Sequence, residues 1–279
     1  DANILITGEN GTGKELLARE IHRMSARCGK PMVSLDMGAI PESLFESELF
    51  GHKKGAFTDA YADREGKMVA ANGSTLFMDE IGNLPLHLQA KMLVALQSRM
   101  VVPLGGNAAK PIDIRLVAAT NRNLFSMVES GEFRQDLLFR INTIHINLPP
   151  LRKRAVDIVP LAGIFLTHYC EKYKKEPLSI SQAAASRLTS HTFEGNIREL
   201  QNIMEKAVIM CDGGEIQPEH LQLYVPQSQS RGTASTLEEM ERTAIAEAIE
   251  SCGGNLSMVA QRLGITRQTL YNKIKRYGL

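Results

Sequence analysis

The sequence lacks several features that would place it in a membrane or an oxidising compartment. It has no tryptophan, no visible signal peptide, and no apolar run near the about 20 residues that span a bilayer. Its four cysteines lie far apart without a Cys-x-x-Cys pair, and its seven histidines show no ligand spacing, which argues against disulfides and zinc. The formal charge of +1 is too small for the chain as a whole to attract nucleic acid electrostatically. We therefore expect a cytoplasmic protein with reduced thiols and no membrane partner.

A glycine-rich loop near the N-terminus is the most constrained motif. It matches the pattern G-x-x-x-x-G-K-[ST], in which backbone N–H groups wrap phosphates and the lysine reaches the terminal ones. An apolar run at 3–7 precedes it and a segment with helical spacing follows, which places a helix N-terminus beneath the phosphates. Only Glu15 departs from the pattern, where Ser or Thr would hold Mg²⁺. The sequence predicts a nucleoside triphosphate site at Gly8, Glu9, Asn10, Gly11, Thr12, Gly13, Lys14 and Glu15.

A second motif places carboxylates after another apolar run, 74–78. Asp79 would hold Mg²⁺, directly or through water, and Glu80 would orient or deprotonate an attacking water. Adjacent carboxylates are usually only a polar strand end, but the phosphate loop favours the catalytic interpretation. Asn121 follows the apolar run 112–119, and its amide could bind the terminal phosphate or the water. Together these residues predict hydrolysis of the bound triphosphate.

The order of patterns along the chain predicts its domains. Up to about residue 148, helical patterns alternate with apolar runs at 3–7, 32–36, 74–78, 112–119 and 143–148. This alternation predicts an α/β fold with a parallel sheet covered by helices on both faces. After Pro149-Pro150 only helical patterns follow. We expect an α/β subdomain at 1–148, truncated at its N-terminus, a helical lid at 149–223, a flexible linker at 224–236, and a helical domain at 237–279.

The last domain has the pattern of a helix-turn-helix. Predicted helices at 256–263 and 266–277 flank a tight turn at Gly264-Ile265, after a first amphipathic helix at 237–250. Residues 236–250 carry five acids and one base, whereas residues 251–279 carry five bases and no acid. The third helix would enter the DNA major groove as half of a two-fold dimer; a helical oligomerisation tail is the alternative. The DNA-binding candidates are Thr266, Arg267, Gln268, Thr269 and Asn272, near base edges, and Lys273, Lys275 and Arg276, on phosphates.

For other features the residues alone leave two roles open. The segment 49–60 lies within a predicted helical element, yet it holds glycines and an aromatic at what looks like a loop tip. On physical grounds Phe57 is more readily a core plug than an exposed contact. Arg134, Arg140 and Arg198 would stabilise phosphate charge if they lie near the nucleotide, in cis or from a neighbouring subunit, although surface salt bridges are the default for arginine.

These motifs, in this order, resemble the NtrC family of bacterial enhancer-binding proteins, the AAA+ activators of the sigma-54 form of RNA polymerase. The resemblance runs from the phosphate loop to Fis-like terminal helices. It implies an AAA+ P-loop NTPase with a helical lid and a Fis-type helix-turn-helix domain. It also implies that the protein binds ATP with Mg²⁺, and that its dimers assemble into a hexamer or similar ring. Enhancer DNA would be a partner. Hydrolysis would convert the closed promoter complex to the open one. Any receiver or sensor domain, such as that of a two-component system, would lie before residue 1.

The resemblance also assigns roles to particular residues. Glu is usual at the position of Glu15. Arg134 and Arg140 match arginine fingers that act on the neighbouring subunit's nucleotide, and Arg198 matches the second sensor. The family's signature loop contacts sigma-54, which reverses the plug assignment of Phe57. That loop is similar to Gly55, Ala56, Phe57, Thr58, Asp59 and Ala60.

Two residues depart from the family pattern, and two other classes of protein share part of it. Asp59 replaces a usual Gly. Asp36 replaces a usual Asn that acts as a switch by bonding the catalytic Glu. A carboxylate facing Glu80 would repel it, so we expect ATPase activity with altered coupling.

One alternative is a nucleotide-regulated DNA-binding factor that does not engage sigma-54. The other is an ATPase like replication initiators or clamp loaders, which would share the fold without the loop.

Overall fold

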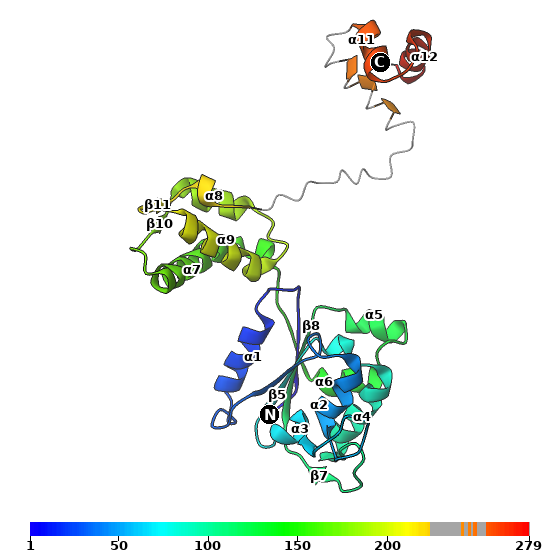
Figure 1. Ribbon diagram of the computed structural model, residues 1–279, viewed down its shortest axis with the longest axis vertical. Helices are drawn as coiled ribbons and strands as arrows, with labels where there is room; N and C mark the ends of the chain where they lie inside the picture. Colours follow the sequence, from blue (N-terminus) through cyan, green and yellow to red (C-terminus); the bar gives the residue numbers. More distant parts are fainter. Residues whose placement is uncertain (224–240, 243–244, 247, 250–254, 279) are drawn as a thin grey trace. The chain divides into compact units, whose positions relative to one another are not determined.

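The computed structural model describes residues 1–223, 241–242, 245–246, 248–249 and 255–278. The chain divides into two compact units, Asp1–Leu223 and Tyr224–Leu279 (Figure 1). The predicted linker at 224–236 and most of the predicted helix at 237–250 lie outside the described residues. Within the described ranges, no helix combines the length and apolar character that a membrane crossing requires.

A five-stranded parallel sheet forms the centre of the first unit. Its strand order is β2-β5-β8-β1-β9, and all of its pairings are parallel. The strands are β1 Ile4–Thr7, β2 Val33–Asp36, β5 Thr75–Asp79, β8 Arg115–Thr120 and β9 Ile144–Asn147. Each strand lies within or next to one of the five predicted apolar runs. The predicted parallel α/β sheet is therefore confirmed.

The three central strands, β5, β8 and β1, are buried on both faces, because their successive side chains enter two different cores. Ile4 and Ile6 of β1 pack in one core with Ala18 of α1, which spans Lys14–Arg23. Leu5, between them, belongs to the core on the opposite face. Strands buried on both sides have continuous apolar sequences instead of an alternating pattern, which explains why the runs were visible in the sequence.

Five helices contribute to the core on the face opposite α1. They are α2 Phe45–Phe50, α3 Lys67–Ala70, α4 Leu86–Ser98, α5 Leu124–Glu129 and α6 Gln135–Ile141. The start of α5 is fixed by the side chain of Asn123, which accepts hydrogen bonds from the backbone N–H groups of Phe125 and Ser126. Single-turn 3-10 helices lie at Glu42–Leu44, Ile81–Asn83, Leu151–Lys153, Ala155–Asp157 and Pro218–His220.

Two small antiparallel ladders also occur in this subdomain. Strands β3 Gly51–His52 and β4 Arg64–Glu65 pair with each other, as do β6 Met100–Val101 and β7 Lys110–Pro111. The expectation that residues 49–60 lie within a helical element is therefore wrong beyond Phe50. The cause is Gly51, whose φ of 82° ends α2 and whose missing Cβ would lie 2.6 Å from the carbonyl oxygen of Arg64.

The lid packs three helices around a separate core. They are α7 Ile158–Tyr173, α8 Gln182–Ser190 and α9 Asn196–Met210. The expectation of helices alone is corrected by a parallel ladder between β10 Ser179–Ile180 and β11 Glu215–Ile216. Strands of two residues are too short to give a hydrophobic period in the sequence. The ladder joins the segment that follows α7 to the segment that follows α9.

The second unit confirms the helix-turn-helix pattern in its described part. Helix α11 spans Leu256–Arg262 and helix α12 spans Arg267–Tyr277. The side chains of Asn255 and Thr266 accept hydrogen bonds from backbone N–H groups at the two helix starts, and the predicted helices at 256–263 and 266–277 agree with these bounds to within one residue. Leu270 of α12 is fully buried in the small core between these helices.

Candidate functional site

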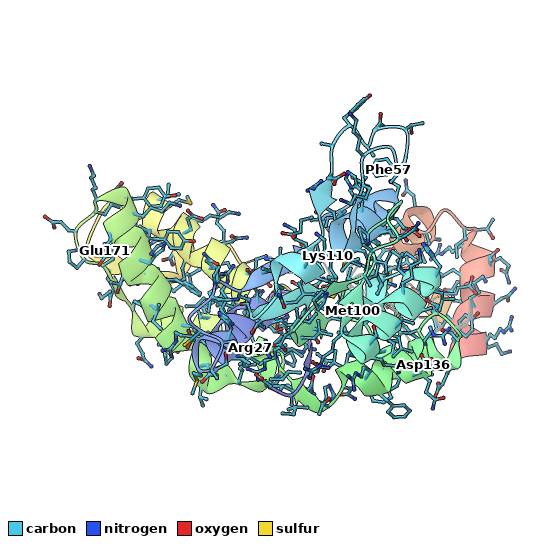
Figure 2. The ribbon with its side chains drawn as sticks, turned by 90° about the horizontal axis from the view of Figure 1, so that it is seen from below. Arg27, Phe57, Met100, Lys110, Asp136 and Glu171 are labelled. Atoms are coloured by element: carbon cyan, nitrogen blue, oxygen red, sulfur yellow. The ribbon has the colours of Figure 1, made fainter. Side chains whose placement is uncertain are left out.

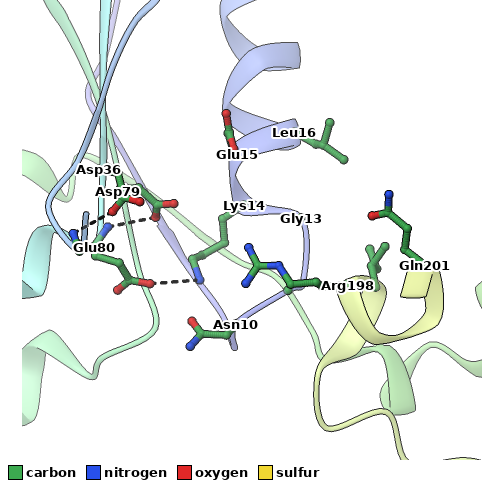
Figure 3. A pocket seen from close by; sticks show the side chains of 13 residues that line it. Asn10, Gly13, Lys14, Glu15, Leu16, Asp36, Asp79, Glu80, Arg198 and Gln201 are labelled. Carbon is green, nitrogen blue, oxygen red and sulfur yellow. Dashed lines mark hydrogen bonds and ion pairs between the residues drawn. The ribbon is translucent and has the colours of Figure 1, made fainter. Parts of the chain in front are cut away.

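A cavity of about 510 Å³ lies where the carboxyl ends of the strands face the lid (Figure 3). This volume falls within the range of ordinary small-molecule sites. The phosphate loop, the ends of β2 and β5, and helix α9 form its wall. The lining residues are Asn10, Gly11, Gly13, Lys14, Glu15, Leu16, Asp36, Gly38, Asp79, Glu80, Ile197, Arg198 and Gln201.

The phosphate loop is held in a conformation that only glycine adopts easily. Gly11 and Gly13 have φ values of 75° and 100°, and Gly13 directly precedes α1. The buried Lys14 ammonium donates to the carbonyl oxygens of Gly8 and Glu9, at 3.1 and 3.3 Å. The Thr12 hydroxyl also donates to the Glu9 carbonyl. The loop therefore curls around the lysine, next to the N-terminus of a helix whose dipole favours anions.

The carboxylates lie in the cavity wall beside Lys14 (Figure 3). Glu80 Oε1 is 4.0 Å from Lys14 Nζ, and Glu80 Oε2 accepts a long hydrogen bond from the Asn121 backbone N–H. Asp79 Oδ1 accepts from the Glu80 backbone N–H at 3.0 Å. Burial raises the pKa of both the Asp79 and Glu80 carboxyls, and the Lys14 charge opposes this rise. A carboxylate with a raised pKa is a stronger proton acceptor than an ordinary one.

Glu80 is placed by an uncommon backbone conformation. Its φ of 54° is left-handed, which costs about 1–3 kcal/mol for a residue with a side chain. The turn lies directly after β5, so the Glu80 side chain is directed into the cavity near Lys14 (Figure 3). Strain of this kind persists where the surrounding structure imposes it, and it is concentrated at functional sites.

Asp36 lies beside these carboxylates, as the register of Asp36 opposite Asp79 requires. Its Oδ1 accepts a hydrogen bond of 2.8 Å from the backbone N–H of Gly38. A Cβ at Gly38 would lie 3.2 Å from that oxygen and 3.8 Å from Glu80 Cγ, so Gly38 separates the two acidic side chains. The Asp36 charge adds to the rise in the Glu80 pKa, after burial as the main cause. The effect of Asp36 on the orientation of Glu80, which the sequence suggests, stays a prediction.

Two further predicted residues reach the loop from different elements. The Asn121 side chain, after β8, donates to the Asn10 side-chain oxygen at 2.9 Å. Arg198 extends from α9 toward Lys14 (Figure 3). Ile197 and Gln201 also line the cavity from α9, and the sequence analysis missed them. Helical spacing could have found Gln201, because it is three residues after Arg198 and shares its face.

The other two candidate arginines lie away from this cavity in their own chain. Arg134 precedes α6, is exposed, and forms an ion pair of 2.7 Å with Asp136. Arg140 donates to the carbonyl oxygen of Leu96, in the last turn of α4, at 2.9 Å. Among the residues that line the cavity, neither arginine occurs. Any role at a nucleotide therefore concerns another subunit's site.

The segment that carries Phe57 projects from the α/β subdomain (Figure 2). Phe57 is half-buried, with its ring edge-on to His52 at a centroid distance of 4.9 Å. Thr58 and Asp59 are exposed, as is Gly55, while Ala56 is half-buried and Ala60 buried. Phe57 is thus neither a plug of the main core nor a free side chain, but part of a small contact at the base of the projection.

The projection is closed at its base by polar contacts. Asp63 accepts from Lys53 Nζ at 2.5 Å and from the Lys54 backbone N–H at 2.8 Å. These bonds hold the pKa of the Asp63 carboxyl below its usual range. The Ser47 hydroxyl shares a 2.7 Å hydrogen bond with His52, which fixes the ring beneath Phe57. The loop tip therefore extends from a base whose conformation is held by these hydrogen bonds.

Helix α12 presents most of the DNA-binding candidates to solvent. Arg267, Gln268, Asn272, Lys275 and Arg276 are exposed. The hydroxyls of Thr266 and Thr269 share a hydrogen bond of 2.7 Å at the helix start. The sequence analysis missed Tyr271, 49% exposed and one turn after Arg267.

Lys273 has a contact that the sequence did not reveal. Its ammonium forms an ion pair with Glu241, which also accepts from the Tyr277 hydroxyl at 2.7 Å. These two partners hold the pKa of the Glu241 carboxyl below its usual value. A contact between Lys273 and a DNA phosphate would compete with this pair. The assignment of Lys273 to phosphate binding stays a prediction.

Three families match successive parts of the chain. They are described as the sigma-54 interaction domain, at residues 1–147, the AAA+ ATPase lid domain, at 152–238, and the Fis family of bacterial regulatory proteins, at 236–277. The chain is 46% identical to the transcriptional regulatory protein ZraR of Klebsiella oxytoca, over 99% of this chain and 64% of that protein. It thus spans just under two thirds of the relative's length.

Solved structures of NtrX from Brucella abortus have the same fold. The complex with ADP has a TM-score of 0.73 at 30% identity, and it covers 100% of this chain and 65% of that one. The complex with ATP has a TM-score of 0.72 at 30% identity, with 100% and 64% covered.

Proposed function

Because this chain belongs to the sigma-54 interaction family of AAA+ proteins, we propose that it is a sigma-54-dependent transcriptional activator that hydrolyses ATP. The observation that carries the proposal is the convergence of Lys14, Asp79, Glu80 and Arg198 on one cavity. These groups come from the loop, a strand end and the lid. Such a constellation suits a phosphoryl transfer, in which catalysis consists mainly of positioning and electrostatic stabilisation.

The donor set of the cavity fits a nucleotide with Mg²⁺. The loop's backbone N–H groups and Lys14 would hold the phosphates, and Asp79 would hold the metal ion. In the described ranges, no cluster of three His, Cys, Asp or Glu side chains could hold a metal by itself. One carboxylate combined with phosphate oxygens and water is the usual arrangement for Mg²⁺. When bound, the ion would neutralise charge on the terminal phosphates.

The chain's own residues would accept the proton of the attacking water and position the reacting groups. Glu80 orients a water and accepts its proton, while the water oxygen bonds to the terminal phosphorus and the bond to the bridging oxygen breaks. Lys14 moves from the loop carbonyls to the phosphate oxygens, and Arg198 approaches from the lid. Arg134 of a neighbouring subunit completes the site, which requires a ring or similar oligomer. The bond between Asn121 and Asn10 keeps β8 in register with the loop.

The projection that carries Phe57 would contact sigma-54, and its conformation would change when ATP is hydrolysed. It lies on the same subdomain as Glu80, so a change at the strand ends can reach it through α2 and the β3–β4 ladder. In the proposed cycle, enhancer-bound dimers assemble into a ring, and the projection engages sigma-54 when ATP is bound. Hydrolysis then remodels the closed promoter complex to the open one.

The experiment that tests this function is open-complex formation on a sigma-54-dependent promoter, with and without ATP. In Phe57→Ala, we expect ATP turnover within about twofold of the wild type, because the loop is remote from the cavity. Open-complex formation should fall by about tenfold or more, because removing an aromatic anchor from an interface costs upward of 1 kcal/mol.

Tyr61→Ala is the matched control, because Tyr61 is an exposed aromatic just beyond the proposed contact residues. It should retain open-complex formation. Normal open complexes from Phe57→Ala would contradict the role of the loop. ATP turnover without any sigma-54-dependent opening by the wild type would instead favour a nucleotide-regulated DNA-binding factor.

The exposed residues of α12 predict two kinds of DNA contact. Arg267→Ala should cost about 1–3 kcal/mol of binding to the preferred site and relax its sequence preference, because arginine reads base edges. Lys275→Ala should weaken binding to all sequences similarly and lower the slope of log K against log salt by about one. Salt titrations with preferred and scrambled duplexes separate the two. Equal effects of both variants on both duplexes would contradict the assignment.

A further inference from the structure

The lid is fastened to the phosphate loop by a residue at one of the loop's variable positions. The Glu9 carboxylate accepts from both Nη atoms of Arg152, which lies at the start of the lid, at 2.7 and 2.5 Å. Glu9 also accepts from the buried Asn196 side chain at 3.2 Å. The hydrogen bonds from Arg152 and then Asn196 lower the pKa of Glu9 to about 2, so the carboxylate stays charged.

Asn196 and the residue after it extend this contact toward the nucleotide. The Asn196 amide donates to the Asn10 carbonyl at 3.0 Å, and its oxygen accepts from the Leu151 backbone N–H at 2.7 Å. The Ile197 backbone N–H donates to the Gly11 carbonyl at 2.9 Å. Arg198 follows directly on the same helix turn. The position of Arg198 over the cavity is therefore set by how the lid sits on the loop.

The approach of the two segments is close enough to require glycine. A Cβ on Gly11 would lie 2.3 Å from the Gly195 carbonyl oxygen and 3.1 Å from Arg198 Cβ. Arg152 and Glu9 are themselves partly exposed, with 41% and 42% of their side-chain surfaces accessible. An ion pair this exposed adds little to global stability. Its value lies in geometry, because a bidentate arginine fixes orientation as well as distance.

We propose that Glu9, Arg152 and Asn196 form a clamp that holds the lid in register on the phosphate loop, with Arg152 as a positioning residue for Arg198. The proposal rests on the function proposed above for Arg198 and the cavity. The clamp makes the loop and the start of α9 move as one body. Its loss should leave the loop able to bind diphosphate but misplace the lid arginine that reaches the terminal phosphate.

The test uses the full chain with Arg152→Ala, and Glu9→Gln as a second route to the same loss. We expect kcat for ATP to fall about tenfold or more, while the Kd for ADP changes less than about threefold. The Ile197 amide should exchange with solvent about tenfold faster, because the clamp protects its bond to Gly11. The midpoint of thermal unfolding should move by only a few degrees, which separates positioning from stability.

A double-variant cycle identifies the residue through which Arg152 acts. Arg152→Ala combined with Arg198→Ala should have the kcat of Arg198→Ala alone, because a positioning residue adds nothing once its target is gone. Lys153→Ala is the matched control: it removes one positive charge from the next residue, whose side chain makes no hydrogen bond to the loop in the described part of the chain, and should match the wild type.

Three outcomes would overturn the clamp. The first is an unchanged rate of amide exchange at Ile197 in Arg152→Ala, and the second is an unchanged kcat in that variant. The third is a kcat of the double variant that is lowered by the product of the two single losses. A wild type that turns over no ATP would refute the proposed function instead. Amide exchange would still decide whether the clamp exists, since it needs no turnover.

Discussion

Glu80→Gln is expected to lower the rate of ATP hydrolysis by about 10²- to 10⁴-fold while ATP still binds. Glutamine keeps the size of the side chain but cannot accept the proton of the attacking water. The contacts of Lys14 with the loop carbonyls do not involve Glu80, so the phosphate loop should keep its form. Steady-state hydrolysis and equilibrium binding of labelled ATP, measured on the same preparation, check both halves of the prediction.

Glu171→Gln provides the control for this variant. Glu171 lies at an exposed position on the lid helix α7, away from the cavity (Figure 2). The same chemical change there should leave hydrolysis unaltered. Turnover by Glu80→Gln within a few fold of the wild type would remove Glu80 as the base. The raised pKa of Glu80 would then reflect its burial and the nearby charges of Asp79 and Asp36, without a part in the reaction.

Arg134→Ala is expected to lower hydrolysis by about 10³-fold or more, the usual contribution of an arginine that stabilises charge in the transition state. In the structure this arginine is exposed, and its guanidinium forms a bidentate ion pair with the neighbouring, equally exposed Asp136. An exposed pair of this kind is readily exchanged for a phosphate. Binding of ATP to each subunit should remain.

Mixed oligomers test whether Arg134 acts on the neighbouring site. Arg134→Ala subunits keep Glu80, and Glu80→Gln subunits keep Arg134, so some interfaces in a mixture contain one complete site. Hydrolysis should reappear on mixing two nearly inactive proteins. Failure to recover activity at any ratio would contradict action in trans.

Arg140 is distinguished from Arg134 by its contact within the chain. Its hydrogen bond to the Leu96 carbonyl satisfies a group at the end of α4, where cations are favoured by the helix dipole. The resemblance assigns both arginines as fingers, but the structure gives Arg140 a bond that it must break to reach another subunit. The same mixing experiment with Arg140→Ala subunits compares the two directly.

The main features of the fold could be predicted from the sequence because their signals are local. The five parallel strands, of which the central three are buried on both faces, appear as continuous apolar runs. The loop from Gly8 to Lys14 has a spacing that few other structures require. The starts of α11 and α12 could be predicted to within one residue for the same reason, since a capping side chain bonds a backbone N–H two or three positions away. The ladders at Gly51–His52 and Ser179–Ile180 were missed because each spans only two residues.

The sequence by itself determined which groups take part in the chemistry: the loop with Lys14, the acids after β5, and the basic last helix. Only the tertiary structure decided how they meet. Asn121 on Asn10, Arg152 on Glu9 and Lys273 on Glu241 join residues 32 to 143 positions apart. Local patterns cannot encode such pairs, because whether two distant side chains meet depends on the packing of every element between them.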